Sequence, residues 1–343
     1  MKKEKIQSFT CFLVLCFSTF LFGETLLETA NRYFNEDKLD KAEYLYKKAL
    51  EQDANKAVIY FNLANIYYKK KDIAQSIEHY KMVIGLASQF KDAYLNIGKI
   101  HYLYGNYRES ADMFIAYLAV NSNDQETQLL AGDVYLKMKL YDKAEQHYQA
   151  ALSISSTNAE AYIAISDLYQ SLGDMNRAYD IVNEGLMQNR DSVYLRETEA
   201  QVLADLGKYR ESAAVYRSVI RSLSNMQAER ITPLYYDTAD VLLRGGYTNL
   251  AIHTVREYID RFPGNDAMTD YLSSLYFTAL RYDDAFEFYS SMYGKNRIRA
   301  YKGIKKLLVY AYNNDDDDLM ERIREFYREH NIQDSMSEVL YEE

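Results

Sequence analysis

Asp40-Lys-Ala-Glu-Tyr-Leu-Tyr46 is a short stretch of this sequence that returns, with changes, at a constant distance. Its later copies are Ala74-Gln-Ser-Ile-Glu-His-Tyr80, Arg108-Glu-Ser-Ala-Asp-Met-Phe114 and Asp142-Lys-Ala-Glu-Gln-His-Tyr148. The closing aromatic residues lie 34 residues apart each time, and the same register continues to Val182 and Tyr216. A fixed period of this length is typical of a protein built from stacked helical repeats.

The register divides most of the chain into repeats of 34 residues. Six repeats occupy residues 24–226 without a gap, and two more follow over residues 232–299. Within every repeat the eighth and the twentieth positions carry Ala, Gly or Ser, whereas tyrosine recurs at positions four, eleven, seventeen and twenty-four. Small side chains let two helices approach closely, and aromatic side chains at helical spacing fill the seams between helices. The columns therefore predict two packed helices in each repeat.

This pattern resembles the tetratricopeptide repeat, and the resemblance covers about residues 24–299. It implies an all-α fold, a right-handed superhelical solenoid of antiparallel helix pairs with about eight repeats. Glycines stand where the turn between the two helices of a repeat is expected, because such turns need free backbone angles. These glycines are Gly105, Gly173, Gly207 and Gly246.

The last third of the chain departs from the regular period. Residues 227–231 are expected to form an irregular joint, and Thr232 followed by Pro233 is expected to begin the next helix. Residues 300–330 predict a capping helix pair whose outer side carries polar residues, among them Lys305 and Lys306, because the end of a solenoid needs a polar cap. Residues 331–343 form an acidic tail.

The first 23 residues predict a signal peptide for export. A basic start at residues 2–5 precedes an apolar run of 14 residues at 9–22. That run is shorter than the about 20 residues of a membrane-spanning helix and has the length of a secretory leader. Both cysteines, Cys11 and Cys16, lie inside it, so a mature chain would carry no thiol. Cleavage after Gly23, retention as an N-terminal anchor and acylation of Cys16 stay open as alternatives.

Charge and motifs exclude several classes of function. The formal net charge is −10, and without residues 2–5, which carry +2, it would be −12. Nucleic acid and anionic membrane surfaces are therefore not expected partners, because both require a basic face. The sequence contains neither a His-Glu-x-x-His pair nor a glycine-rich phosphate loop, and it suggests no nucleophile with a matching base. We therefore expect no enzymatic activity and no cofactor.

Four consecutive aspartates, Asp315 to Asp318, are the one cluster of possible metal ligands. They lack the central glycine and the closing glutamate of a calcium loop. Negative charge near a helix N-terminus is favourable because of the helix dipole. We therefore interpret the aspartates as the start of a helix and expect no metal site.

The resemblance also implies where a partner would bind. In this family the first helix of each repeat lines a concave groove, into which positions two, five, nine, twelve and thirteen point. The aromatic residues expected there are Phe34, Phe61, Tyr68, Tyr102, Tyr194, Tyr236 and Phe277. The polar and charged residues expected there are Asn31, Asn65, Lys69, Lys99, Asp133, Asp167, Glu197, Asp205 and Asp240. The later charges are acidic, which favours a basic partner segment. Each aromatic side chain could instead pack along its own helix, and this alternative stays open.

Repeats and an export signal together predict a non-catalytic scaffold or adaptor of the cell envelope, either free in the periplasm or tethered. It would hold a partner protein or peptide in a partly acidic groove. A cytoplasmic co-chaperone or regulatory adaptor with an uncleaved N-terminal helix is the alternative. An enzyme with an accessory repeat region is not expected, because no segment of about 100 residues lies outside the repeats to form a catalytic domain.

Overall fold

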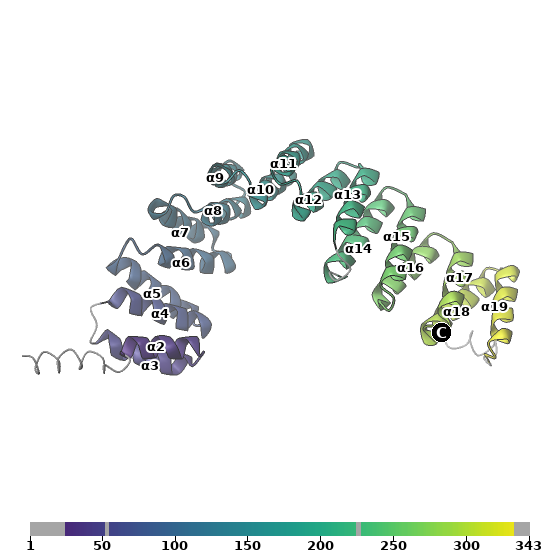
Figure 1. Cartoon of the computed structure of the whole chain (residues 1–343), viewed down its shortest axis with the longest axis horizontal. Helices are drawn as coiled ribbons and strands as arrows, with labels where there is room; N and C mark the ends of the chain where they lie inside the picture. Colours follow the sequence, from purple (N-terminus) through teal and green to yellow (C-terminus); the bar gives the residue numbers. More distant parts are fainter. Residues whose placement is uncertain (1–24, 52–54, 224–227, 333–343) are drawn as a thin grey trace, which may run out of the picture. The chain divides into compact units, whose positions relative to one another are not determined.

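A computed structural model describes residues 25–51, 55–223 and 228–332. The predicted signal peptide, including the Cys16 alternative, and the acidic tail beyond residue 332 lie outside the described residues. The chain forms two compact units, the first ending at Leu172 and the second beginning at Gly173. Every regular element among the described residues is an α-helix (Figure 1), so the predicted all-α fold of helix pairs is confirmed.

The first unit contains four helix pairs followed by a single helix, the first helix of the fifth repeat. Along the chain each helix packs against the next one, both within a pair and between pairs. The helices are α2 (Leu26–Asn35), α3 (Leu39–Leu50), α4 (Lys56–Lys69), α5 (Ile73–Leu86), α6 (Lys91–Leu103), α7 (Tyr107–Val120), α8 (Gln125–Lys137), α9 (Tyr141–Ile154) and α10 (Ala159–Ser171).

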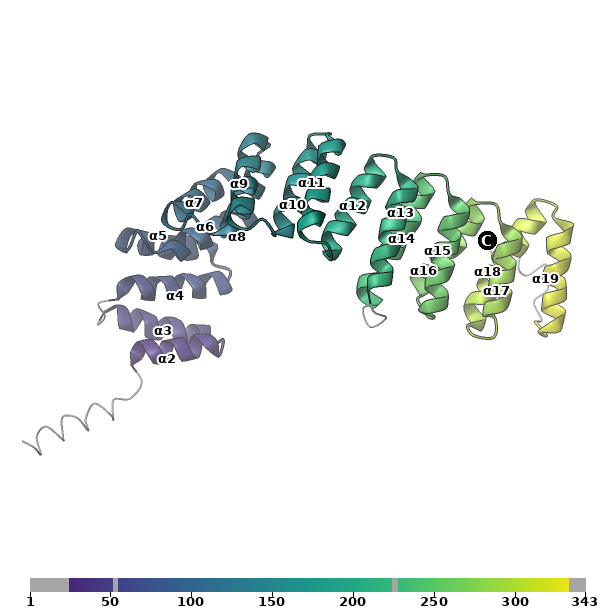
Figure 2. The ribbon, with the colours of Figure 1, turned by 45° about the horizontal axis from the view of Figure 1, so that its top comes forward.

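The second unit continues with the second helix of the fifth repeat and four further pairs. Figure 2 shows α12 to α19 following one another as a row of packed helices. The helices are α11 (Met175–Gln188), α12 (Val193–Asp205), α13 (Tyr209–Ser222), α14 (Ala228–Arg244), α15 (Thr248–Arg261), α16 (Asp266–Thr278), α17 (Tyr282–Met292), α18 (Arg297–Asn313) and α19 (Asp317–Glu329).

Polar side chains begin many of these helices. Thr25 and Glu28 form a capping box, in which the Thr25 hydroxyl accepts from the Glu28 N–H at 3.1 Å and the Glu28 carboxylate accepts from the Thr25 N–H at 2.8 Å. Such bonds satisfy N–H groups that the first helical turn leaves unpaired. Side chains that cap other helices in this way belong to Asp72, Asp124, Asn158, Asp174, Ser192, Asn265, Asn296 and Asp316.

The turn inside each repeat depends on its fifteenth residue, which has a left-handed backbone in all eight repeats. Four of these residues are the predicted glycines, with φ between 74° and 78°. The other four, with φ between 55° and 66°, are Asp37, Lys71, Lys139 and Leu280. A left-handed conformation costs a residue with a side chain more than it costs glycine. The turn geometry is therefore constant although its sequence signal is present in only half of the repeats.

The predicted seams between helices are confirmed. The side chains at position twenty are fully buried in all eight repeats, as Ala42 and Ala144 illustrate. Tyr46 and Tyr148, at position twenty-four, are also fully buried. Where position twenty is serine, its hydroxyl can bond across the seam: Ser110 donates to the carbonyl of Gly98 at 2.8 Å. The small residues therefore mark the points where paired helices touch.

The start of α14 differs from the prediction. We expected Thr232 to begin this helix after an irregular joint at 227–231, but α14 already begins at Ala228 and contains Pro233 in its interior. Proline lacks an N–H and usually occurs in the first turn only. The side chain of Ile231 is fully buried in the core of the second unit, and this burial favours the longer helix.

The end of the second unit agrees better with the expectation. Helices α18 and α19 form the predicted capping pair, with α18 beginning three residues before residue 300. The Asp316 carboxylate accepts from the Leu319 N–H at 3.1 Å, and two further aspartates lie in the first turn of α19. The interpretation of the four aspartates as a helix start is therefore confirmed.

Candidate binding face

Within each unit the first helices of successive repeats lie next to one another, and we call the surface that they share in that unit its first-helix face. It comprises α2, α4, α6, α8 and α10 in the first unit, and α12, α14, α16 and α18 in the second. Side chains of these helices bond from one repeat to the next: Lys69 pairs with Asp37 at 2.8 Å, and Lys99 pairs with Glu126 at 2.9 Å. The predicted binding residues all belong to this face.

Position nine of this face is linked to the seam by a tyrosine hydroxyl. Position twenty-four supplies the tyrosine, whose hydroxyl donates to the side chain at position nine of the same repeat. Tyr46 donates to Asn31 at 2.5 Å, and Tyr148 donates to Asp133 at 2.7 Å. The same bond joins Tyr80 to Asn65 and, at 3.5 Å, Tyr216 to Gln201. The buried seam therefore orients these polar side chains.

In the third and fifth repeats, at least one of the two groups that form this bond is missing. In the third repeat, position nine is Lys99, which cannot accept a hydrogen bond, and position twenty-four is Phe114 rather than tyrosine. In the fifth repeat, position twenty-four is Val182 and offers no hydroxyl to Asp167. The Asp167 carboxylate accepts instead from the side-chain amide of Gln170, at 3.2 Å.

The predicted aromatic residues divide into two groups. Phe61, Tyr102 and Tyr236 pack against neighbouring rings, with centroids 5.0 Å from Phe90, 5.9 Å from Tyr107 and 5.1 Å from Tyr271 respectively. This packing agrees with the alternative that these aromatic side chains pack between helices and do not serve as binding residues. The second group lies nearer to solvent or to a charge. The Phe34 ring lies beneath the Lys69 ammonium, and Tyr68 and Tyr194 are 37% and 63% exposed.

Asp133 and Asp167 form an acidic pair in the first unit. Burial raises the pKa of both carboxyl groups, and the charge of Asp133 raises the pKa of Asp167 further. Water reaches Asp167, but the surrounding protein limits the hydration of its carboxylate. The Tyr148 hydrogen bond opposes the rise in the pKa of Asp133. The nearby Lys137 charge opposes it as well, but within the described residues neither carboxylate forms an ion pair with Lys or Arg.

Acidic residues of the second unit are partly neutralised. Arg230 contacts both carboxylate oxygens of Glu197 at 2.6 Å, and Arg244 pairs with Asp205 at 3.2 Å. Asp240, by contrast, is exposed. The predicted run of negative charge through the later repeats is therefore interrupted by arginines from α14. Sequence reasoning missed these arginines because they lie 33 and 39 residues from their partners.

Family models identify the repeat. Tetratricopeptide repeat models match residues 45–78, 95–159 and 135–202. The chain is a tetratricopeptide repeat protein. Repeats of this family generally serve as non-catalytic interaction modules. No curated protein matches this chain.

Solved tetratricopeptide repeat proteins share the fold. The C-terminal part of a repeat-containing protein from Cytophaga hutchinsonii aligns with a TM-score of 0.58 at 12% identity, over 71% of this chain and 98% of that one. A tetratricopeptide repeat protein from Parabacteroides merdae aligns with a TM-score of 0.51 at 17% identity, over 73% and 96%. At these identities the likeness concerns the arrangement of helices.

Two other properties bear on the site of this repeat protein. Among the described helices, none combines the length and the apolar character needed to span a membrane. Within residues 25–332, apart from the gaps given above, no three His, Cys, Asp or Glu side chains converge as metal ligands would. His147, for example, stacks on Tyr135 and bonds to Gln128 at 2.7 Å, which makes it part of the packing.

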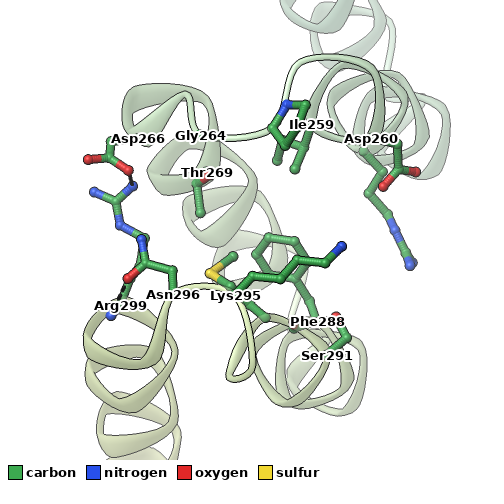
Figure 3. A pocket seen from close by; sticks show the side chains of 13 residues that line it. Ile259, Asp260, Gly264, Asp266, Thr269, Phe288, Ser291, Lys295, Asn296 and Arg299 are labelled. Carbon is green, nitrogen blue, oxygen red and sulfur yellow. Dashed lines mark hydrogen bonds and ion pairs between the residues drawn. The ribbon is translucent and has the colours of Figure 1, made fainter.

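Sequence reasoning also missed a pocket of about 470 Å³ in the second unit of this repeat protein. It lies where the loops that follow α15 and α17 meet (Figure 3), with Phe288 and Ile259 among its apolar lining residues. One wall is the ion pair between Arg299 of α18 and Asp266 of α16, drawn dashed in Figure 3. No sequence motif marks this pocket, because its lining comes from four helices and two loops.

The raised pKa of Asp167 leads to a stability prediction. An ionised carboxylate that folding desolvates opposes folding at pH values above its folded-state pKa. Asp167→Asn removes this charge, so we expect a higher free energy of unfolding at pH 7, by less than about 1 kcal/mol because water still reaches the side chain. The advantage should diminish as the pH falls through the folded-state pKa and vanish below the unfolded-state pKa of about 3.9.

Urea unfolding of both proteins between about pH 3 and pH 8 measures this effect. The matched control is Asp180→Asn, at an exposed position of α11. A loss of stability at pH 7 in Asp167→Asn, or an equal gain in the control, would contradict the claim that the Asp167 carboxylate opposes folding.

Proposed function

We propose that this protein is a non-catalytic scaffold of the cell envelope, exported through its N-terminal leader, whose first-helix face binds a basic segment of a partner protein. The observation that carries the proposal is the Asp133–Asp167 pair, which forms no ion pair with Lys or Arg among the described residues. Limited hydration makes ionisation of both carboxyl groups costly, and the Asp133 charge adds to that cost at Asp167. A lysine or arginine side chain of a partner would remove that cost, so the face favours a basic ligand.

The first unit provides further support for this site. The Tyr148 hydroxyl fixes the Asp133 side chain, so little conformational freedom is lost when a partner binds. Burial raises the pKa of the Tyr102 phenol and the nearby Asp133 charge raises it further, so this half-buried ring lies close to Asp133. A lysine stem packs well on such a ring while its ammonium reaches the acids.

A fluorescent octa-lysine peptide tests the site by anisotropy titration. We expect Asp133→Lys with Asp167→Lys to weaken its binding at least about tenfold, because two attractive charges become repulsive. Asp133→Asn with Asp167→Asn keeps the side-chain shape and should weaken binding by a smaller factor. The matched control is Glu78→Lys with Asp112→Lys, which makes the same change of charge on the second helices α5 and α7.

Equal losses in the control and in the acidic-pair variants would mean that net charge alone attracts the peptide. Unchanged affinity in both acidic-pair variants would remove the Asp133–Asp167 pair from the proposal. Circular dichroism of each variant shows whether the helices are intact.

Export has a separate test. The mass of the native protein purified from its own cells distinguishes cleavage after Gly23, an intact leader and a lipid on Cys16. Recovery of the uncleaved chain from the cytoplasmic fraction would favour the alternative of a cytoplasmic adaptor.

A further inference from the structure

The end of the first-helix face in the second unit differs in charge from the acidic pair of the first unit. Here α16 and α18 enclose a pocket of about 430 Å³. We infer that this pocket is a second binding site, which receives carboxylate side chains of an acidic segment of a partner protein. The residues that carry the inference are Asp270, Ser273, Tyr289, Arg299, Lys302 and Lys306.

One guanidinium bridges the two acids of this pocket. The Arg299 guanidinium pairs with Asp266 and, at 3.3 Å, with Asp270. Lys302 and Lys306 are exposed, and within the described residues neither forms an ion pair with Asp or Glu. We had expected Lys306 on the outer side of the capping pair, but it lines the pocket that faces α16. Two ammonium groups without an ion-pair partner therefore line a pocket whose three cations outnumber its two carboxylates by one charge.

Helix packing gives no reason for these cations. Helix α18 carries five basic residues and no acidic one among its 17 residues, although the whole chain has a net charge of −10. Lys302 and Lys306 are four residues apart, and like charges at this spacing lie on one helix face and destabilise the helix slightly. Basic residues in the first turn also oppose the helix dipole. A bound anion would offset these costs.

The base of the pocket offers hydroxyl groups. Ser273 and Tyr289 are hydrogen-bonded to each other through their hydroxyls, and both line the pocket. Gly303 lets α18 approach the Tyr289 ring closely, because a Cβ at this position would lie 2.1 Å from Cε1 of that ring. Lys302 and Lys306 of α18 line the same pocket as these two hydroxyls. Hydroxyls and ammonium groups are the donors that carboxylates accept from.

The size and charge of the pocket favour a short acidic segment over a nucleic acid. A volume of about 430 Å³ accommodates one or two carboxylate side chains. A nucleic acid needs an extended basic stripe, whereas two free lysines on an acidic protein provide a local contact only. This inference rests on the proposed function in one respect: in both units the first helices of the repeats are taken to receive partner segments.

A fluorescent octa-glutamate peptide and the full chain provide the test. Anisotropy titration at low salt should show saturable binding, and Lys302→Glu with Lys306→Glu should weaken it at least about tenfold. Lys302→Gln with Lys306→Gln removes the charges without adding repulsion and should also weaken binding. The control is Lys48→Glu with Lys81→Glu on α3 and α5, which changes the net charge equally and should leave affinity within about twofold.

Three outcomes would overturn the inference: no saturable binding of octa-glutamate, an equal loss in the control variant, or octathymidylate bound as tightly through the same lysines. Octa-lysine binding is measured in parallel on all variants. If octa-lysine binding fails while octa-glutamate binding depends on the two lysines, the proposed function is wrong and this inference stands. The opposite pattern supports the proposed function and overturns this inference.

Discussion

Gly132→Leu is expected to lower the free energy of unfolding by about 3 kcal/mol, at the upper end of the usual cost of overpacking. A Cβ at Gly132 would lie 2.3 Å from Cε1 and 2.5 Å from Cδ1 of the Tyr148 ring. That ring is fully buried, and its hydroxyl is held by Asp133. Because the ring cannot move aside, α8 and α9 must separate or the Asp133 bond must break.

Gly85→Leu is the matched control, because a Cβ at Gly85 would meet nothing within 4 Å. Leucine has a higher helix propensity than glycine, so this variant should gain up to about 1 kcal/mol. Urea denaturation followed by circular dichroism measures both. The same substitution in two helices of the first unit should thus have opposite signs, and a loss of similar size in both would refute the close contact at Gly132.

Phe114→Ala is expected to cost about 3–5 kcal/mol, since it empties a fully buried aromatic site at the seam of the third repeat. The cavity would lie between Gly98, whose Cβ position is 2.6 Å from the ring, and the neighbouring buried residues of α7 and α8. Repeats in a solenoid contact only their neighbours, so the loss should be local. Hydrogen exchange should accelerate first in α6, α7 and α8.

Tyr104→Ala provides the comparison, because Tyr104 is 60% exposed at the end of α6. It should change the free energy of unfolding by no more than about 0.5 kcal/mol. Exchange that accelerates evenly over every helix of the chain in Phe114→Ala would show that the repeats unfold as one unit, against the expectation of local loss.

The sequence was sufficient for the fold because the same packing problem recurs in every repeat. Small residues at position twenty and aromatic residues at position twenty-four repeat often enough to define both the period and the seams. Helix boundaries and turns differed from the sequence pattern at positions where the usual preference for proline or glycine does not hold. Burial of Ile231 extends α14 past a proline, and Leu280 adopts a left-handed conformation without the glycine that would have announced it.

The charge of the candidate face could be predicted only in part. Column nine was identified from the period, and Asp133 and Asp167 lie on first helices of their repeats, as the period places them. The electrostatic character of each acid depends on partners that the period does not reveal. Arg230 neutralises Glu197 from the next repeat, whereas the acidic pair has no such partner among the described residues. Lys306 was misplaced because a helix at the end of a solenoid has both an outer side and an inner side.

The hydroxyl link between columns nine and twenty-four has a consequence for how such a protein can change its ligand preference. In four repeats an acceptor at position nine is matched by tyrosine in the adjoining seam, and the one lysine there, Lys99, is matched by Phe114. Converting an acceptor into a cation by a single substitution would strand a phenolic proton without its acceptor inside the protein, at a cost of about 1–3 kcal/mol. Recognition and architecture are thus thermodynamically coupled, and new specificity in this array is reached most readily by exchanging two residues together.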